Sequence, residues 1–288
     1  MAYEIVVCVK QVPDTENLSG EVMKEDGTVN RAALPAIMNP EDLNALEMAL
    51  QVKDRYGGTV TVITMGPPSA AEVLRSALYR GADRVVLLTD RKFAAADTLA
   101  TSYALSQAVR KVGEVDLVFC GRQAIDGDTA QIGPQLAEKL GVAQYTYADQ
   151  ILSIEDGRLT VRRSLEGGYE VLRGPMPCLL TVVAAANQPR PPAVKRLLRS
   201  CKTRAPSEPA QAGPSGAPAR QTQGPPIEQW SADDVGCDAA RCGGSGSPTK
   251  VKKIESVKLV SSGHRQVEPT HEGLSELVCE LMAEHILE

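Results

Sequence analysis

Short runs of β-branched and aliphatic residues alternate with longer, helix-like segments along the first two thirds of the chain. The predicted strands cover residues 3–10, 59–65, 84–88, 115–120 and 178–183. Near-continuous apolar strands joined by helices are typical of a parallel sheet covered on both faces, because crossover helices lie over the sheet. The pattern therefore predicts an α/β fold with a doubly wound, mostly parallel sheet.

Sequence signals for helix ends divide the helical segments. Asn39 and Pro40 open the first helix, with a capping amide, a proline at the first helical position and acids in the first turn. Residues 69–72 read Ser-Ala-Ala-Glu, which is a capping box, and Gly81 ends that helix. The remaining helices are predicted over residues 97–112 and 129–140.

Turn residues predict antiparallel hairpins in addition to this regular alternation. Asp-Gly and Gly-Gly pairs within residues 155–158 and 166–169 separate segments of alternating polarity. A third signal, Glu-Asp-Gly-Thr at residues 25–28, predicts a hairpin inserted after the first strand.

The composition changes after residue 202. Residues 203–249 are rich in Pro and Gly and contain one Ile and one Val, so this stretch buries too little apolar surface to offset its ordering entropy. We expect an α/β domain over residues 1–202, a Pro/Gly-rich linker over 203–249 and a C-terminal arm over 250–288.

The C-terminal arm ends in a strongly amphipathic segment. Apolar residues recur there at helical spacing, so the segment has a wide apolar stripe to bury. The stripe docks either on the chain's own sheet domain or on a partner subunit, and the sequence leaves both open. Its members are Leu274, Leu277, Val278, Leu281 and Met282.

Composition excludes several classes of function. The chain of 288 residues has a formal net charge of −5, unlike the basic surface of a nucleic-acid-binding protein. Its longest apolar run, residues 178–186, is shorter than the roughly 18 residues needed to cross a bilayer, so no membrane insertion is expected. Seven scattered Cys, with Cys8, Cys120 and Cys178 in apolar runs, indicate reduced thiols and a cytoplasmic protein.

Other common chemistries lack their sequence signals. The dipeptide Gly-Lys of a P-loop does not occur, and no G-x-G-x-x-G follows the first strand. His264, His271 and His285 lie away from the α/β segments. Cys237 and Cys242 lie close together in the sequence without a second such pair of Cys. A structural zinc site needs four ligands, so no metal site is expected.

The segment after the fourth predicted strand carries the most distinctive chemistry. It reads Gly-Arg-Gln-Ala-Ile-Asp-Gly-Asp-Thr-Ala-Gln-Ile-Gly over residues 121–133 and leads from the carboxyl end of a strand into a helix, where open α/β sheets bind ligands. Its glycines allow the backbone to approach a ligand, helix N–H groups hold phosphate, and Arg122 adds a fixed charge. Asp126 and Asp128 would repel phosphate, so we expect them to cap N–H groups or to accept from ribose hydroxyls. These features favour nucleotide binding; a plain turn with a helix cap is the alternative.

The same motifs resemble those of a known family. The resemblance rests on Val9-Lys10-Gln11-Val12-Pro13-Asp14, Met38-Asn39-Pro40, Met65-Gly66-Pro67, Gly81-Ala82-Asp83-Arg84 and, above all, Gln123-Ala124-Ile125-Asp126 continuing to Gly133. Over nearly its whole length the chain resembles the beta subunit of electron-transfer flavoproteins. The resemblance implies a fold of the adenine-nucleotide-binding type and pairing with an alpha subunit.

The resemblance also implies which residues bind the nucleotide. They lie at the strand ends and helix starts that the pattern of the chain selects. The implied cofactor-binding residues are Cys8, Asn39, Pro40, Glu41, Asp42, Met65, Arg122, Gln123, Ala124, Ile125, Asp126, Gly127, Asp128, Thr129, Ala130, Gln131, Ile132 and Gly133.

Within the family, the loop is most similar to that of the electron-bifurcating members, whose beta subunit holds FAD. Simple carriers hold AMP there, usually with Lys in place of Arg122 and a bulkier centre in place of residues 127–130. Cys242-Gly243 and residues 246–249 also resemble bifurcating members. FAD is therefore the expected cofactor, and AMP is the alternative.

Resemblance to the bifurcating members implies a division of electrons. NADH would reduce the beta-subunit FAD, which would send one electron to ferredoxin or flavodoxin and the other, through the alpha-subunit FAD, to a dehydrogenase. Arg122 is the expected flavin-tuning residue, since a fixed cation stabilises the reduced flavin. Two alternatives stay open: the AMP-binding beta subunit of a non-bifurcating carrier, and a stand-alone universal-stress-type nucleotide-binding module.

The family's partner-docking loop corresponds to residues 186–199, with Val194 at the position of the usual Leu anchor. One apolar side chain in a partner's pocket concentrates the binding energy of a small interface. Nearby basic residues with no acid among them favour an acidic partner, although a solvated basic helix end has the same composition. They are Arg190, Lys195, Arg196, Arg199, Lys202 and Arg204.

Overall fold

The computed structural model describes residues 2–14, 35–208, 225–250, 266–284 and 286–287. It divides into two units, Met1–Lys250 and Val251–Glu288. The predicted hairpin at residues 25–28 lies outside the described residues.

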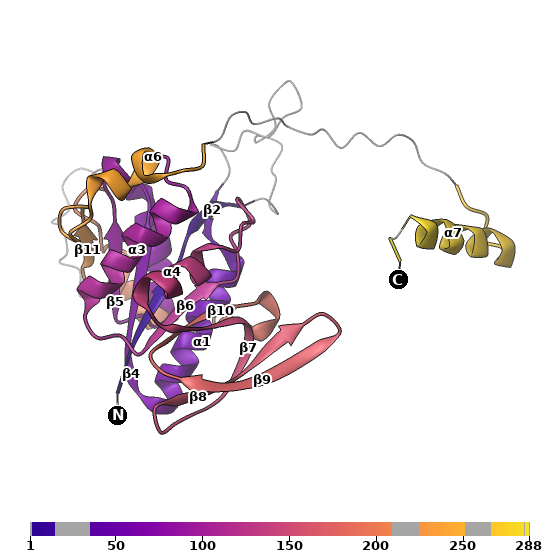
Figure 1. The fold of residues 1–288 in the computed structure, drawn as a ribbon, viewed down its shortest axis with the longest axis horizontal. Helices are drawn as coiled ribbons and strands as arrows, with labels where there is room; N and C mark the ends of the chain where they lie inside the picture. Colours follow the sequence, from indigo (N-terminus) through magenta and orange to yellow (C-terminus); the bar gives the residue numbers. More distant parts are fainter. Residues whose placement is uncertain (1, 15–34, 209–224, 251–265, 285, 288) are drawn as a thin grey trace. The chain divides into compact units, whose positions relative to one another are not determined.

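Nine strands form the main sheet of the first unit. They are β1 (Tyr3–Cys8), β4 (Gly58–Met65), β5 (Arg84–Leu88), β6 (Leu117–Gly121), β7 (Ala143–Glu155), β8 (Arg158–Leu165), β9 (Gly168–Pro175), β10 (Cys178–Val182) and β11 (Ile227–Trp230). Their order is β11-β5-β4-β1-β6-β10-β7-β8-β9 (Figure 1). Neighbours are parallel from β11 to β7 and antiparallel from β7 to β9, which confirms the predicted mostly parallel sheet with added hairpins.

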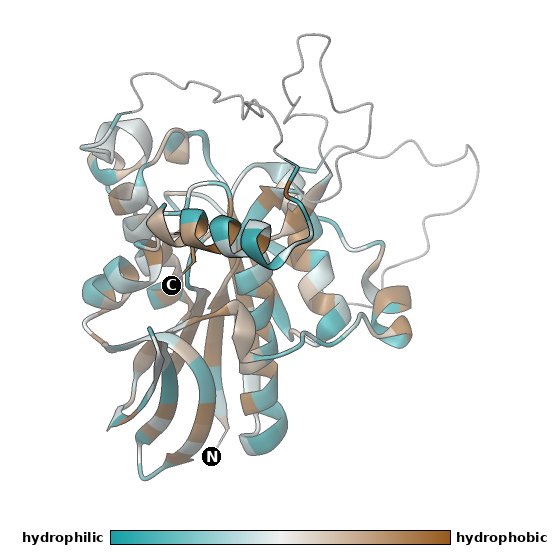
Figure 2. Ribbon diagram, turned by 90° about the vertical axis from the view of Figure 1, so that its right-hand side faces the viewer, coloured by the Kyte–Doolittle hydropathy of each residue, from teal (hydrophilic) through white to brown (hydrophobic). Residues whose placement is uncertain are grey.

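Two longer helices cover each face of this sheet, as the sequence predicts. They are α1 (Pro40–Tyr56) and α2 (Ala71–Arg80) on one face, and α3 (Thr98–Val112) and α4 (Ile132–Leu140) on the other. Val7 joins the apolar cluster of α1 and α2, whereas Val6 joins that of α3 and α4, because successive strand side chains face opposite ways. Along these helices, Figure 2 shows polar residues in teal beside apolar residues in brown, consistent with one buried and one exposed side.

Shorter elements complete the first unit. A separate antiparallel pair, β2 (Gln11–Pro13) and β3 (Ala36–Met38), follows β1 and precedes α1. The short helices are α5 (Val194–Ser200) and α6 (Gly243–Gly246), and the 3₁₀ turns are η3 (Pro68–Ala70), η4 (Arg91–Phe93), η5 (Ala184–Ala186) and η6 (Ala239–Arg241).

The predicted starts of two helices are wrong. Ser69 lies within η3 and α2 begins at Ala71 without a side-chain cap, so the capping box is not formed. The helix predicted from residue 129 begins at Ile132, because Asp128 and Ala130 have backbone φ angles of 47° and 52°, which a right-handed helix excludes.

Part of the predicted linker, residues 225–250, is folded against the sheet. β11 pairs in parallel with β5, and the buried Trp230 ring lies under the side chains of Arg84 and Lys111. Average composition misses this strand because the few large apolar residues of the stretch stand together at Ile227 and Trp230, where the sheet edge supplies main-chain partners.

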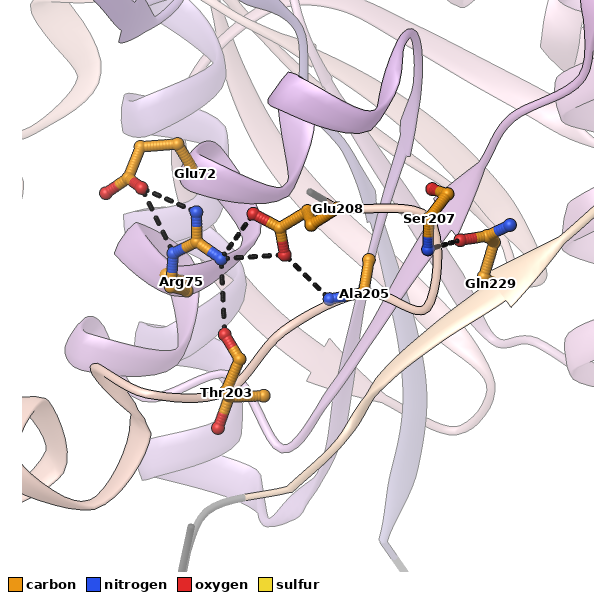
Figure 3. A network of polar contacts seen from close by, with 7 residues as sticks. All are labelled: Glu72, Arg75, Thr203, Ala205, Ser207, Glu208 and Gln229. Atoms are coloured by element: carbon orange, nitrogen blue, oxygen red, sulfur yellow. Dashed lines mark hydrogen bonds and ion pairs between the residues drawn. The ribbon is translucent and has the colours of Figure 1, made fainter. Parts of the chain in front are cut away.

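Residues 203–208 of the same predicted linker are held by polar contacts (Figure 3). Arg75 of α2 donates to both carboxylate oxygens of Glu208 at 2.9 and 3.0 Å and to the carbonyl oxygen of Thr203 at 3.2 Å. The main-chain N–H of Ser207 donates to the side chain of Gln229 at 2.9 Å. The segment after α5 is therefore tied to both α2 and β11.

The described part of the second unit contains the helix α7 (His271–Ala283), whose first turn is capped by the Thr270 side chain. The amphipathic helix predicted from the sequence is thus confirmed, and Leu274 and Val278 of its apolar stripe are 53% and 45% exposed. No described helix combines the length and the apolar composition that crossing a bilayer requires.

Candidate functional site

The carboxyl ends of β1 and β6 meet at the switch point of the sheet. Helices α1 and α2 cover one face of the sheet, and α3 and α4 cover the other. The connections on the two sides of this strand pair therefore leave toward opposite faces. Open α/β sheets bind ligands in the crevice that results. Cys8 and Cys120 lie side by side in register at its floor, and both are buried. The hydrogen bond to Cys8, together with burial, raises the pKa of the Cys120 thiol well above its usual range. Cys120 is therefore a neutral part of the floor, and half-buried Met65 ends the neighbouring strand β4.

Asp42, in the first turn of α1, joins the two central strands. Its carboxylate accepts the main-chain N–H of Lys10 at 2.8 Å, just beyond β1, and that of Gly121 at 2.9 Å, at the end of β6. A Cβ on Gly121 would lie 2.4 Å from an Asp42 oxygen. The sequence predicts that Gly121 leaves room for a ligand, but the Asp42 side chain of the protein itself fills this space.

Asn39 and Glu41 hold the loop that follows β6. The Asn39 side chain, fully buried, donates to the carbonyl oxygen of Gln123 at 2.8 Å and accepts the N–H of Ile125 at 3.1 Å. Glu41 accepts the N–H of Gln123 at 2.8 Å. The prediction that the Asn39 side chain caps α1 is wrong, because its amide bonds to the loop and makes no capping bond.

The charged side chains around the loop are engaged by partners. The Arg122 guanidinium lies 3.1 Å from the buried Glu41 carboxylate, and the Lys10 ammonium lies 2.6 Å from Asp126. Asp128 accepts from the side chain of Gln123 at 3.1 Å. The sequence predicts that Asp126 and Asp128 cap main-chain N–H groups or accept from ribose hydroxyls. In these contacts both carboxylates instead bind side chains of the protein.

The tip of the loop is open to solvent from Ile125 to Thr129, in a turn whose hydrogen bonds run to the carbonyl oxygen of Ala124. A Cβ on Gly127 would meet no atom within 4 Å, so the space beside it is free of protein. Of the glycines in the loop, Gly127 is the one that fits the predicted role of leaving room for a ligand.

The start of α4 follows the loop directly. Gln131 occupies the capping position but makes no side-chain bond to the helix; its side chain accepts from the Thr98 hydroxyl at 2.8 Å. Uncapped N–H groups at a helix start attract anions. Gly133, in contrast, is needed for packing, since a Cβ there would lie 2.3 Å from Thr181 of β10.

The structure adds residues that the sequence did not single out for the site. Lys10 follows β1 and carries the ion pair with Asp126, and Thr98 at the start of α3 binds Gln131. The strand-end rule could have indicated Lys10, because it follows the same strand as Cys8. Nothing in the sequence pairs Thr98 with Gln131, since their contact depends on how α3 and α4 lie together.

The predicted partner-docking segment, residues 186–199, leads into α5, which begins at Val194. Val194 and Leu198 are 72% and 71% exposed. Arg190, counted among the basic residues of the segment, is paired with Glu47 at 2.8 Å and with Asp54 at 2.8 Å on α1. Its charge is therefore largely neutralised within the chain.

Comparisons with known proteins agree on one protein family for this chain. A family model described as the electron transfer flavoprotein domain matches residues 26–235. The electron transfer flavoprotein subunit beta of Clostridium acetobutylicum is 43% identical over 283 residues, which are 98% of this chain and 99% of that protein.

Two further relatives have other names. Protein FixA of Bradyrhizobium diazoefficiens is 46% identical over 256 residues, covering 86% of this chain and 81% of that protein. The caffeyl-CoA reductase-Etf complex subunit CarD of Acetobacterium woodii is 41% identical over 285 residues, covering 98% of this chain and 99% of that protein.

The buried carboxyl of Asp42 should make stability depend on pH. Burial raises the pKa of Asp42 from 3.8 to about 7, against the lowering effect of its hydrogen bonds. Folding then favours the protonated form, so this stabilisation is present at low pH and is lost as the pH rises through about 7. Between pH 5 and pH 8 the free energy of unfolding should fall by about 2.5 kcal/mol on account of this group.

Urea unfolding of the wild type, Asp42→Asn and Asp126→Asn, followed by the fluorescence of Trp230, measures this effect. Asp42→Asn should be less stable at both pH values and should lack this part of the pH slope, whereas Asp126→Asn, an exposed control, should keep it. Equal slopes in the wild type and Asp42→Asn would contradict the assignment.

Proposed function

The chain belongs to the electron transfer flavoprotein beta-subunit family, and from this premise we propose that it binds FAD in the loop after β6 and takes electrons from NADH. Members of this family work in electron transport and pair with an alpha subunit. The proposed complex divides the electrons between a low-potential acceptor, ferredoxin or flavodoxin, and the alpha-subunit FAD, which serves a dehydrogenase. The relative CarD is named as a subunit of a reductase–Etf complex, which supports a role beside a partner oxidoreductase.

One observation carries the proposal: a solvent-open loop is held rigidly at the switch point and leads into an uncapped helix start. The buried Asn39 and Glu41 fix the loop backbone from α1, while residues 125–129 stay exposed. Such a preorganised loop binds a ligand without first having to be ordered. Asp126 and Glu41 are paired with cations, which reduces the repulsion that a diphosphate meets on approaching the N–H groups of α4.

The residues of the site have separate proposed roles. The N–H groups of Ile132 and Gly133 hold phosphate, and the side chains of Thr129 and Gln131 add neutral hydrogen-bonding groups. Cys8 and Met65 form the apolar floor. The open space beside Gly127 suits the extended FAD better than AMP. When bound, FAD supplies the hydride and one-electron chemistry.

Arg122 is proposed to tune the flavin as a tethered cation. Its guanidinium is held by Glu41, at 3.1 Å, so it keeps a fixed place beside the loop. A fixed positive charge stabilises the negative charge that a flavin gains on reduction. The Glu41 carboxylate weakens this effect, and the pair together sets the local potential.

The helix α5 is proposed to dock the partner dehydrogenase. Val194 and Leu198 offer exposed apolar side chains on one short helix, which packs on α2. Their exposure means that they contribute little to the stability of the chain itself. An anchor of this kind gives affinity when a partner's pocket covers it.

The nucleotide content of the purified heterodimer tests the proposed function. We expect two FAD per heterodimer and no AMP, measured by denaturing the complex and separating the released nucleotides by chromatography. One FAD and one AMP would replace the proposal by a simple carrier. One FAD with no second nucleotide would refute nucleotide binding by this chain.

Replacement of Arg122 tests the tuning role. Arg122→Ala should lower the potential of the beta-site flavin by tens of millivolts, on the order of one lost charge interaction in a partly solvated site. Arg122→Lys should keep most of the potential, and Glu41→Gln combined with Arg122→Ala should recover part of the loss. An unchanged potential in Arg122→Ala with FAD still bound would exclude the role.

Replacement of Val194 tests the docking role. Val194→Asp should raise the KM for the partner dehydrogenase about tenfold. The substitution replaces the apolar anchor by a charge, and loss of a central anchor costs more than about 1 kcal/mol. Val171→Asp, at a valine of β9 that is 50% exposed, is the control and should leave this KM unchanged. Steady-state electron transfer to the dehydrogenase measures both, and equal KM values for the wild type and Val194→Asp would rule the anchor out.

A further inference from the structure

Tyr147 of β7 is turned out of the core by an irregular backbone. It has a φ of 57°, in the left-handed region, and is 40% exposed, whereas Tyr145 and Ala148 on either side are buried. In a regular strand Tyr145 and Tyr147 would face the same way. The register between β7 and β10 shifts at this point, and such bulges are known to re-aim side chains near binding sites.

A left-handed conformation is unfavourable for a bulky residue, so the surrounding structure must hold it. The main-chain N–H of Tyr147 donates to the hydroxyl of Thr181 on β10 at 3.1 Å. The methyl group of the same threonine fills the space left by Gly133 at the start of α4. Thr181 therefore links the conformation of Tyr147 to the helix start of the candidate site.

The Tyr147 ring lies beside Arg122. The guanidinium carbon is 5.7 Å from the ring centroid, and the guanidinium is also paired with Glu41. The main-chain N–H of Arg122 donates to the carbonyl oxygen of Val182 at 2.9 Å, which fixes the start of the loop against β10. An exposed aromatic ring and a fixed planar cation thus stand together at the carboxyl edge of the sheet.

We propose that Tyr147 contacts the cofactor, its exposed ring stacking on the planar ring system of the bound flavin nucleotide. This inference rests on the proposed function of the loop. A fused aromatic ring of this kind has large apolar faces, which an aromatic side chain covers well. The neighbouring Arg122 is electrostatically attracted to the Tyr147 ring, so Tyr147 also positions the tuning cation. Turned inward, the ring would gain burial in a relaxed backbone; its outward position is explained by a ligand that covers it.

The chain provides a matched control in Tyr169 of β9. This tyrosine is 66% exposed and has the Arg162 guanidinium carbon 5.3 Å from its ring centroid. It shares with Tyr147 the residue type and an arginine beside the ring, and it is also open to solvent. It does not contact the loop-fixing residues Arg122 and Thr181 in the described chain.

The experiment uses the heterodimer with its alpha subunit, depleted of the beta-site flavin and titrated with FAD. The variants are Tyr147→Leu, Tyr147→Phe and Tyr169→Leu, and the readouts are the dissociation constant and the quenching of flavin fluorescence. Tyr147→Leu should weaken binding about fivefold to tenfold, as for one lost aromatic contact, and should bind FAD with less quenching. Tyr147→Phe and Tyr169→Leu should match the wild type.

The outcomes separate the two proposals. Wild type without a beta-site flavin would refute the proposed function and this inference with it. Wild type with that flavin, combined with unchanged affinity and quenching in Tyr147→Leu, would overturn the role of Tyr147 alone. Gel filtration of the same variants covers the remaining case: if Tyr147→Leu loosens the heterodimer while FAD affinity in the intact complex is unchanged, Tyr147 belongs to a subunit interface and the inference fails.

Discussion

The site depends on the burial of three polar side chains at the N-terminal end of α1. Asn39, Glu41 and Asp42 lie almost entirely out of water, and a buried polar group without a partner costs more than its hydrogen bond contributes. Their partners are main-chain groups at the ends of β1 and β6 and in the loop that follows β6. The helix start and the loop can therefore be satisfied only together, which fixes the loop relative to both central strands.

This arrangement also determines how charge is distributed. Arg122 and Lys10 each face a carboxylate, and the acidic residues of the loop are engaged by side chains. Under the proposed function, the helix start of α4 is the main source of attraction for a phosphate, because its N–H groups are fixed by the fold and need no reorganisation. Main-chain geometry would then orient the phosphate, and the charged side chains would act on other parts of the ligand.

The two sides of the loop are held by different means. On the α1 side the contacts are buried hydrogen bonds, whereas on the β10 side they are close packing and a bulge: Gly133 against Thr181, and Tyr147 turned outward. The loop start is tied to the same strand through Arg122 and Val182. Changes at β7 or β10 can thus reach the site without touching the loop sequence, as can changes at the start of α1.

Local sequence patterns were enough to predict the layered α/β architecture, the hairpins after α4 and the amphipathic C-terminal helix, because each depends on periodicity or turn chemistry within a short window. It also located the loop after β6, since a glycine-rich segment between a strand and a helix has a defined place in such a sheet. It did not give the roles within the loop. Gly121 and Gly133 look alike in the sequence, yet one makes room for Asp42 and the other for Thr181.

The folded chain was needed to see which polar residues are buried together and where the sheet ends. Asn39 has the sequence of a helix cap, but its partners lie 84 and 86 positions away, and no local pattern records such a contact. β11 joins the edge of the sheet from a stretch whose average composition is that of a linker, because a sheet edge supplies main-chain partners that composition does not count. Long-range packing against an existing surface is the physical reason in both cases.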